Sequence, residues 1–186
     1  MNDLIVFNKP YGVICQFGAH EKHGCLKDYI DKPGFYPAGR LDTDSEGLLL
    51  LTNNGRLQAE IADPKYKKEK TYWAQVEGSP DEAKLDMLRQ GVDLGDFVAR
   101  PAKVRLLAAE ETAHLWPRHP PIRERKSVPD FWLEIKISEG KNRQVRRMTA
   151  KAGYPCLRLV RVAVGRLNLF DLGLRLGEWQ FAQARP

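Results

Sequence analysis

Four consecutive leucines, Leu48–Leu51, constrain the fold more than any other segment of the chain. A short apolar run that ends at turn residues is typical of a fully buried strand, and Asn53-Asn54-Gly55 follows this one. Leu4–Phe7 is a second such run, and it ends at the turn Lys9-Pro10-Tyr11-Gly12. We therefore expect two core strands in the first third of the chain.

Later segments predict three more strands and a helix. The strand patterns lie at Lys70–Glu77, Val104–Ala108 and Phe131–Ile137. Ser79 is expected to cap a helix that has Pro80 at its first position and runs to Gly91. With 186 residues, 42% of them hydrophobic, the chain can fill one shared core. We expect a single domain, 1–186, with two lobes at approximately 1–63 and 64–186.

Positive charge is concentrated in the second half of the chain. The net charge is +6, but residues 118–166 hold 13 basic and 4 acidic side chains, whereas residues 1–50 hold 5 and 7. A helix predicted over Lys141–Ala152, with Asn142 as its cap, has one apolar and one basic face. The two faces are Val145, Met148, Thr149 and Ala152 against Arg143, Arg146, Arg147 and Lys151. A phosphate backbone is the natural counter-charge for such a face.

Residues 116–129, which we call the arm, are rich in proline and in basic side chains. The prolines exclude a helix or a central strand, so the arm is predicted to be a loop. Its basic residues are Arg118, Arg123, Arg125 and Lys126. A solvated surface loop and an electropositive arm for a polyanion both fit this composition.

Three carboxylates, Asp42, Asp44 and Glu46, lie in a glycine-flanked turn that enters the leucine strand. A calcium loop of the EF-hand type is excluded, because Asn53 stands where the bidentate glutamate is required. Two interpretations stay open: aspartates that cap backbone amides of the turn, and a catalytic Asp42 next to Arg40 that Arg146 keeps ionised.

Four motifs in order resemble the RsuA-type ribosomal pseudouridine synthases. GRLDTDSEGLLLLTNNG at 39–55 is similar to the signature of that family, with Asp42 at its catalytic position. The other motifs are Asn8-Lys9-Pro10-x-Gly12, Lys70-Thr71-Tyr72 and EGKNRQVRRM at 139–148. Leu159-Val160-Arg161 resembles a later element of the family. The sequence also resembles family members that act on large-subunit RNA and have no N-terminal S4 RNA-binding module.

The resemblance implies an α+β fold, with a mixed, mainly antiparallel sheet in two lobes, flanking helices and a central cleft. It implies isomerisation of a uridine of 23S ribosomal RNA to pseudouridine, by base flipping, cleavage of the N-glycosidic bond and rejoining through carbon 5. Asp42, Tyr72 and Arg146 would be the catalytic residues, and Arg40, Leu41 and Leu159 would line the substrate pocket.

RNA contacts are expected from a further set of basic residues. They are Lys9, Arg123, Arg125, Lys126, Arg143 and Arg147. Such an isomerisation requires no cofactor, and the sequence has no metal motif. Two rivals are a ribosome-assembly factor without catalysis and a hydrolase that uses Asp42 with Asp44 or Glu46.

Three cysteines, Cys15, Cys25 and Cys156, lack the CxxC spacing of a zinc site and are odd in number, so thiols in a reducing compartment are predicted. The N-terminal segment has no signal peptide pattern, and no stretch is long and apolar enough for a membrane span. We expect a cytoplasmic protein that is not bound to a membrane and acts as a monomer.

Overall fold

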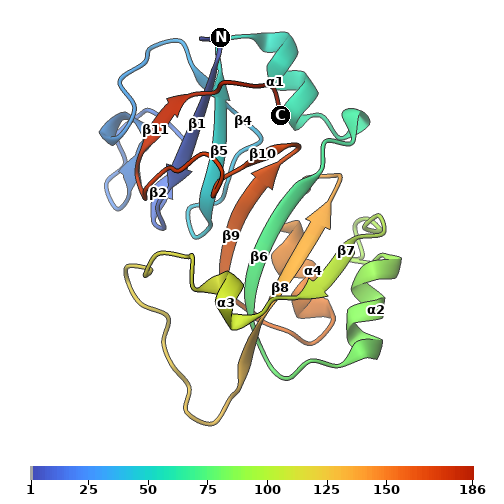
Figure 1. Ribbon diagram of the computed structural model, residues 1–186. Helices are drawn as coiled ribbons and strands as arrows, with labels where there is room; N and C mark the ends of the chain where they lie inside the picture. The colour runs from blue at the N-terminus through green and yellow to red at the C-terminus, as the bar shows by residue number, and fades with distance from the viewer. Residues whose placement is uncertain (1) are drawn as a thin grey trace. The chain divides into compact units, whose positions relative to one another are not determined.

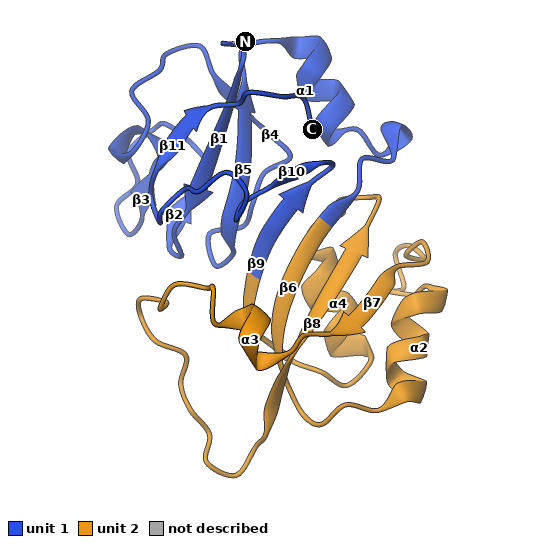
Figure 2. Cartoon of the chain, viewed as in Figure 1, with its two compact units in different colours: residues 1–70, 160–186 blue, residues 71–159 orange. Residues whose placement is uncertain are grey.

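The computed structural model describes residues 2–186 and divides them into two compact units (Figures 1 and 2). Unit 1 consists of the residues up to Lys70 together with Val160–Pro186, and unit 2 is Thr71–Leu159. The chain passes between the units inside two strands, β6 (Lys70–Glu77) and β9 (Cys156–Val164). These units differ from the predicted lobes 1–63 and 64–186, because the C-terminal segment returns to the sheet of unit 1.

Unit 1 is built mainly from strands. They are β1 (Leu4–Lys9), β2 (Val13–Ile14), β3 (Gly24–Cys25), β4 (Tyr36–Ala38), β5 (Glu46–Thr52), the second part of β9, β10 (Leu167–Asn168) and β11 (Trp179–Phe181). Its helices are η1 (Leu26–Asp28), α1 (Gly55–Ala62) and η2 (Pro64–Tyr66). The sheet has the order β11-β1-β5-β9, with β4 beside β5 and β10 beside β9. Strands β5 and β9 pair in parallel, whereas β11 with β1, β1 with β5, β4 with β5 and β10 with β9 pair antiparallel.

The pairing of β1 with β5 forms the core of unit 1. The two strands run antiparallel from the pair Leu4 and Thr52 to the pair Lys9 and Gly47. Every residue of both strands is buried, which explains why their sequences are continuous apolar runs instead of alternating patterns. The prediction of two core strands is confirmed.

The segment after β5 differs from the prediction. Asn53-Asn54-Gly55 was expected to end the strand as a turn, but Asn54 caps helix α1. Its side-chain oxygen accepts hydrogen bonds from the backbone amides of Arg56 and Leu57, both at 3.1 Å. An asparagine can serve in a turn or as a helix cap, so the residue type alone does not predict the helix that follows.

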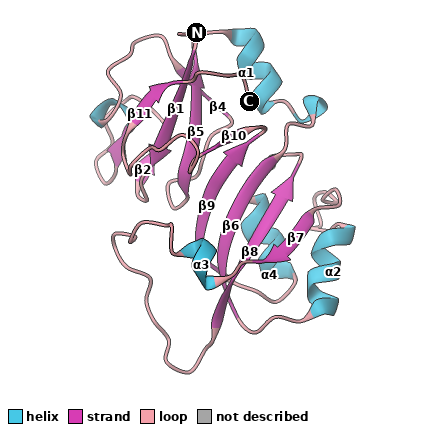
Figure 3. Ribbon diagram, in the orientation of Figure 1, coloured by secondary structure: helices cyan, strands magenta, loops and turns pink. Residues whose placement is uncertain are grey.

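Unit 2 combines three strands with three helices. The strands are β6, β7 (Lys103–Leu106) and β8 (Asp130–Ile137), in the order β6-β8-β7. The helices are α2 (Glu82–Gln90), α3 (Ala109–Thr112) and α4 (Gln144–Lys151). In Figure 3, α4 is seen behind these strands. The three predicted strands are confirmed, and the predicted α+β class with a mixed, mainly antiparallel sheet is confirmed for the chain.

Both helices predicted in unit 2 exist, but their caps were predicted incorrectly. Asp81, not Ser79, caps α2, with its side chain accepting from the backbone amide of Lys84 at 3.1 Å. Helix α4 begins after Arg143, whose left-handed backbone (φ 51°) takes the cap position expected for Asn142. The chain therefore enters α4 through a tight turn, and the helix, Gln144–Lys151, is shorter than the predicted Lys141–Ala152.

Side chains of β6 and β8 alternate between the two faces of the unit 2 sheet, so one face is buried and apolar and the other carries polar side chains. Ala74, Val76 and Leu133 are buried on one side. The other side carries Trp73, whose indole Nε1 donates to Glu134 Oε2 at 3.1 Å, and Arg105 also pairs with Glu134. Because Arg105 binds Glu111 of α3 as well, α3 covers the polar face. The arm that follows α3 has no helix or strand, as predicted.

Gly47 should be intolerant of any side chain. Its φ is +101°, and a Cβ there would lie 2.9 Å from Val160 Cγ1 and closer still to the carbonyl of Arg161 on β9. We expect Gly47→Ala to lower the free energy of unfolding by about 3 kcal/mol or more, measured by urea denaturation. Gly34→Ala is the matched control, because Gly34 has φ +85° with no atom within 4 Å of its Cβ position. It should cost about 1 to 2 kcal/mol. Equal losses in the two variants would contradict the steric argument.

Candidate active site and RNA-binding surface

Asp42 lies in the loop that joins β4 to β5, at the edge of unit 1. The loop closes through a turn in which the backbone amide of Ser45 donates to the carbonyl of Asp42 at 3.0 Å. Asp42 is half-buried, Leu41 is buried and Arg40 is exposed. The loop thus carries a half-buried carboxylate, Asp42, and an exposed arginine, Arg40.

The buried ammonium of Lys9 holds this loop from below. Lys9 Nζ donates to the carbonyls of Val13 at 2.7 Å, Pro10 at 2.9 Å and Thr43 at 3.4 Å. The carbonyl of Thr43, the residue after Asp42, also accepts from the amide of Gly12 at 2.8 Å. The Lys9-Pro10-x-Gly12 turn and the Asp42 loop are therefore fastened to each other. Lys9 was predicted to contact RNA, and that prediction is wrong because its side chain is fully buried and bonded to backbone.

Burial also shifts the pKa values of Lys9 and of the nearby Cys15 thiol. Desolvation lowers the pKa of Lys9 from 10.5 to about 8, against the opposing pull of nearby Cys15, Glu46, Asp44 and Asp42. Burial likewise raises the pKa of the Cys15 thiol, although a hydrogen bond from the Leu41 backbone partly offsets it. The carboxylates of the loop are thus part of what keeps a buried lysine charged.

Arg161 supports the same loop from β9. Its side chain is buried, with Nε donating to the carbonyl of Leu48 and Nη2 to the carbonyl of Gly39, both at 2.8 Å. Gly39 begins the loop that carries Asp42, so β9 and the loop are bonded through one guanidinium. This role of Arg161 was not predicted, because in the sequence only its motif distinguishes it from the other basic residues around it.

In unit 2, the predicted active-site residues lie on β6, α4 and β9. Tyr72 and Leu159 are buried, with 9% and 5% of their surface exposed, and Arg146 is half-buried. By alternation along β6, Tyr72 shares the sheet face of Ala74 and Val76. The predicted apolar face of α4 is confirmed, because Val145 and Met148 are buried.

Two residues of the 139–148 motif are structural and were missed. Glu139 is buried and accepts from Gln144 Nε2 at 2.8 Å and from the backbone amide of Arg100 at 2.7 Å. Gln144 Oε1 in turn accepts from the amide of Lys141 at 3.1 Å. This network fixes the turn before α4 and hence the place of Arg146. No pattern in the sequence distinguishes Glu139 from an exposed acidic residue, because its burial and its partners arise only in the folded chain.

The two arginines of α4 and its cap that were assigned to RNA differ in their surroundings. Arg147 binds the carboxylate of Asp96 and donates to the carbonyl of Leu94 at 3.2 Å, while its guanidinium lies over Phe97. These bonds engage the two terminal nitrogens of a partly exposed guanidinium, and the contact of Arg147 with RNA stays a prediction. Arg143 is exposed, and its RNA contact stays a prediction.

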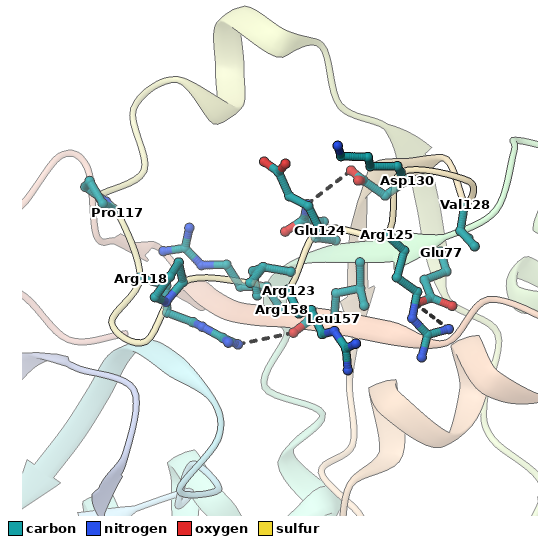
Figure 4. A pocket seen from close by; sticks show the side chains of 14 residues that line it. Glu77, Pro117, Arg118, Arg123, Glu124, Arg125, Val128, Asp130, Leu157 and Arg158 are labelled. Atoms are coloured by element: carbon teal, nitrogen blue, oxygen red, sulfur yellow. Dashed lines mark hydrogen bonds and ion pairs between the residues drawn. The ribbon is translucent and has the colours of Figure 1, made fainter.

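The basic side chains of the arm that were assigned to RNA, Arg123, Arg125 and Lys126, are all exposed. Arg125 pairs with Glu77 of β6 at 3.5 Å (Figure 4). Within residues 2–186, Arg123 and Lys126 make no hydrogen bond or ion pair. The arm therefore has cations to offer an anionic partner.

The predicted catalytic set is divided between the units, with Asp42, Arg40 and Leu41 in unit 1 and Tyr72, Arg146 and Leu159 in unit 2. The expected pairing of Asp42 with Arg146, and the cleft around them, stay predictions. The described residues contain no group of three or more histidines, cysteines or acids that could hold a metal ion. None of the helices described is both long and apolar enough to span a bilayer.

Residues 3–151 match the family of RNA pseudouridylate synthases. The chain belongs to this family and is an RNA pseudouridine synthase, which is an isomerase. The resemblance inferred from the motifs is confirmed.

Individual relatives support the family assignment. The chain is 53% identical to the ribosomal large subunit pseudouridine synthase E of Xanthomonas campestris over 98% of this chain and 96% of the relative. It is 51% identical to the Vibrio vulnificus protein of the same name, over 95% and 74%. A solved structure described as a crystal structure of pseudouridylate synthase matches with a TM-score of 0.78 and 28% identity, over 98% and 71%.

The depressed pKa of Lys9 predicts a pH-dependent contribution to stability. Below pH about 8 both the folded and unfolded states carry the proton; between about 8 and 10.5 only the unfolded state does. Because the unfolded state then binds more protons, this group makes the free energy of unfolding rise with pH, by up to about 3 kcal/mol. We expect Lys9→Met to remove that part of the rise, measured by urea unfolding at pH 7.5 and 10.5. Lys22→Met, at an exposed site, should keep the wild-type difference. A Lys9→Met protein with the wild-type pH dependence would contradict the assignment.

Proposed function

We propose that this enzyme isomerises one uridine of large-subunit 23S ribosomal RNA to pseudouridine, with Asp42 as its catalytic residue. The observation that carries the proposal is the Asp42 loop, fixed by Lys9 and Arg161, in a chain that belongs to the pseudouridine synthase family. The RNA class is supported by relatives named as large subunit pseudouridine synthases at about half identity.

The reaction breaks one bond and forms another without changing the composition of the substrate. The N1–C1′ glycosidic bond of uridine is cleaved, the base turns, carbon 5 bonds to C1′, and the proton on carbon 5 is lost while N1 gains one. No electrons enter or leave, so the proposal includes no redox agent, cofactor or metal. The target uridine must first leave its stack to reach the carboxylate.

Asp42 would act on the sugar as a carboxylate. It would either add to C1′ or remove a ribose proton to give a glycal, and both routes need the ionised form. The proposed role of Arg146 is to pair with Asp42, which suits a planar guanidinium better than an ammonium. Tyr72 would stack under the flipped base and assist removal of the proton from carbon 5. Arg40, Leu41 and Leu159 would line the pocket.

The two rivals are less well supported. A hydrolase that pairs Asp42 with Glu46 needs both carboxylates on the substrate, but Glu46 is 1% exposed within β5. An assembly factor without catalysis would not need a carboxylate in the loop that Lys9 and Arg161 support. The proposed enzyme acts as a monomer in the cytoplasm, and the absence of a disulfide among the described cysteines supports a reducing compartment.

Asp42→Asn should abolish the isomerisation and leave RNA binding intact. The amide keeps the shape of the side chain but can neither add to C1′ nor accept a proton, so we expect a rate loss of about a thousandfold or more. Carbodiimide mapping of 23S RNA measures the product, and filter binding measures affinity. Asp44→Asn, two residues along the same loop, is the matched control and should retain activity. Pseudouridine at the normal level in Asp42→Asn would end the catalytic assignment.

Neutralising the arm should weaken RNA binding. Arg123→Ala, Arg125→Ala and Lys126→Ala together remove three exposed cations, so fewer counterions are released and the slope of log affinity against log salt should fall by about 2 to 3. Arg56→Ala, at a side chain that is 89% exposed in unit 1, is the control for loss of a surface charge. A triple variant with the wild-type salt slope would exclude the arm from the interface.

A further inference from the structure

The arm covers a pocket on unit 2 that has no part in the proposed catalytic site. The pocket has a volume of about 490 Å³, and β6, β8 and β9 each supply lining residues beneath the arm (Figure 4). None of the six residues proposed for catalysis and for the uridine pocket lines it. Its volume falls in the range of small-molecule sites and is large enough for one nucleotide.

Arg158 and Leu157, at the start of β9, contribute to the lining. Arg158 is buried, its Nη2 donates to the carbonyl of Trp116 at 2.8 Å, and its guanidinium lies 5.9 Å from the ring of Trp116 and 6.0 Å from that of Trp132. Such bonds fix the guanidinium plane in place. Unstacked bases rest on aromatic rings and on guanidinium planes, and the half-buried Leu157 adds an apolar side chain to the lining.

The arm itself is tied down where it crosses β9. Arg118 donates to the carbonyl of Pro120 at 2.8 Å and to the carbonyl of Leu157 at 3.3 Å, and Arg125 pairs with Glu77. The segment that covers the pocket is thus held in place by hydrogen bonds and an ion pair. Arg123 and Lys126 lie in the same roof with no polar partner among the described residues, so they are available to a phosphate.

Acceptors in the lining give the pocket a preference among bases. Gln75 Nε2 donates to Asp130 Oδ1 at 3.1 Å, and the exposed residue Glu124 supplies a second carboxylate to the lining (Figure 4). A site that bound phosphate alone would gain nothing from two carboxylates. Carboxylates accept from N–H groups on base edges; the amino groups of adenine, cytosine and guanine carry two hydrogens that can serve two carboxylates, whereas uracil has no amino group and offers only its single N3–H.

We propose that this pocket binds an unpaired adenine, cytosine or guanine nucleotide of the RNA substrate, in addition to the uridine that is modified. Its phosphate would contact Arg123 and Lys126, and its amino group would donate to Glu124 and Asp130. The inference rests on the proposed RNA substrate and adds a recognition site that sets which uridine is chosen. An RNA chain, not a free mononucleotide, is the occupant, because exposed cations at the rim suit a backbone that continues past the site.

Site-specific crosslinking tests the proposal. Ile122, a lining residue of the arm, is replaced by the photoreactive amino acid p-benzoylphenylalanine, and the protein is irradiated with an unmodified 23S RNA transcript. Reverse transcription maps the crosslinks. We expect one dominant stop at an unpaired adenine, cytosine or guanine, and about a tenfold lower yield when that nucleotide is changed to uridine. The same substitution at Met87, 45% exposed on α2, is the control and should not give that stop.

Several outcomes would overturn the inference. They are stops spread over many nucleotides, a dominant stop at a uridine, and an unchanged yield after the change to uridine. Pseudouridine in the same transcript is measured in parallel. If the wild-type protein makes pseudouridine but the Ile122 variant gives diffuse crosslinks, only this inference is wrong. If the wild-type protein makes no pseudouridine, the proposed function is contradicted. The crosslink should also persist in Asp42→Asn.

Discussion

A single buried ammonium ion holds together the parts of unit 1 on which the active site depends. Lys9 ends strand β1, and its three carbonyl acceptors lie in the turn after β1, in β2 and in the loop of Asp42. A compact ammonium with three rotatable donors suits three converging carbonyls better than a planar guanidinium does. Because burying this charge is costly, the nearby carboxylates of the loop have a structural function as well as any chemical one.

The sequence predicts those parts of the fold that depend on local pattern. Apolar runs located β1 and β5, and alternation located β6 and β8, because burial on two faces or on one face leaves a direct trace in residue order. Helix caps were harder to predict. Ser79 and Asp81 are both good capping residues, and only the path of the chain after β6 decides between them. The return of β11 to pair with β1 is a contact between the two ends of the chain and has no local signal.

For the site, motif resemblance located Asp42 but not the forces that hold it. Lys9 carries the same charge as an RNA-binding lysine, and only its hydrogen bonds in the folded chain show that it is internal. Arg161 and Glu139 pose the same difficulty, since a buried charged residue with backbone partners has no compositional signature. Charge in the sequence therefore indicates an anionic partner for the protein, while burial decides which side chains face it.

The number of basic residues in the sequence therefore overestimates the positive charge that is available to RNA. The 118–166 segment holds 13 basic residues, yet Arg158 and Arg161 are buried and bonded to carbonyls. Each cation used in this way adds to the net charge but releases no counterion when RNA binds. The salt dependence of RNA binding should therefore be shallower than the sequence count implies. On the proposed RNA substrate, exposed side chains such as Arg123 and Lys126 would carry a disproportionate share of the electrostatic affinity, and the arm would couple recognition to affinity.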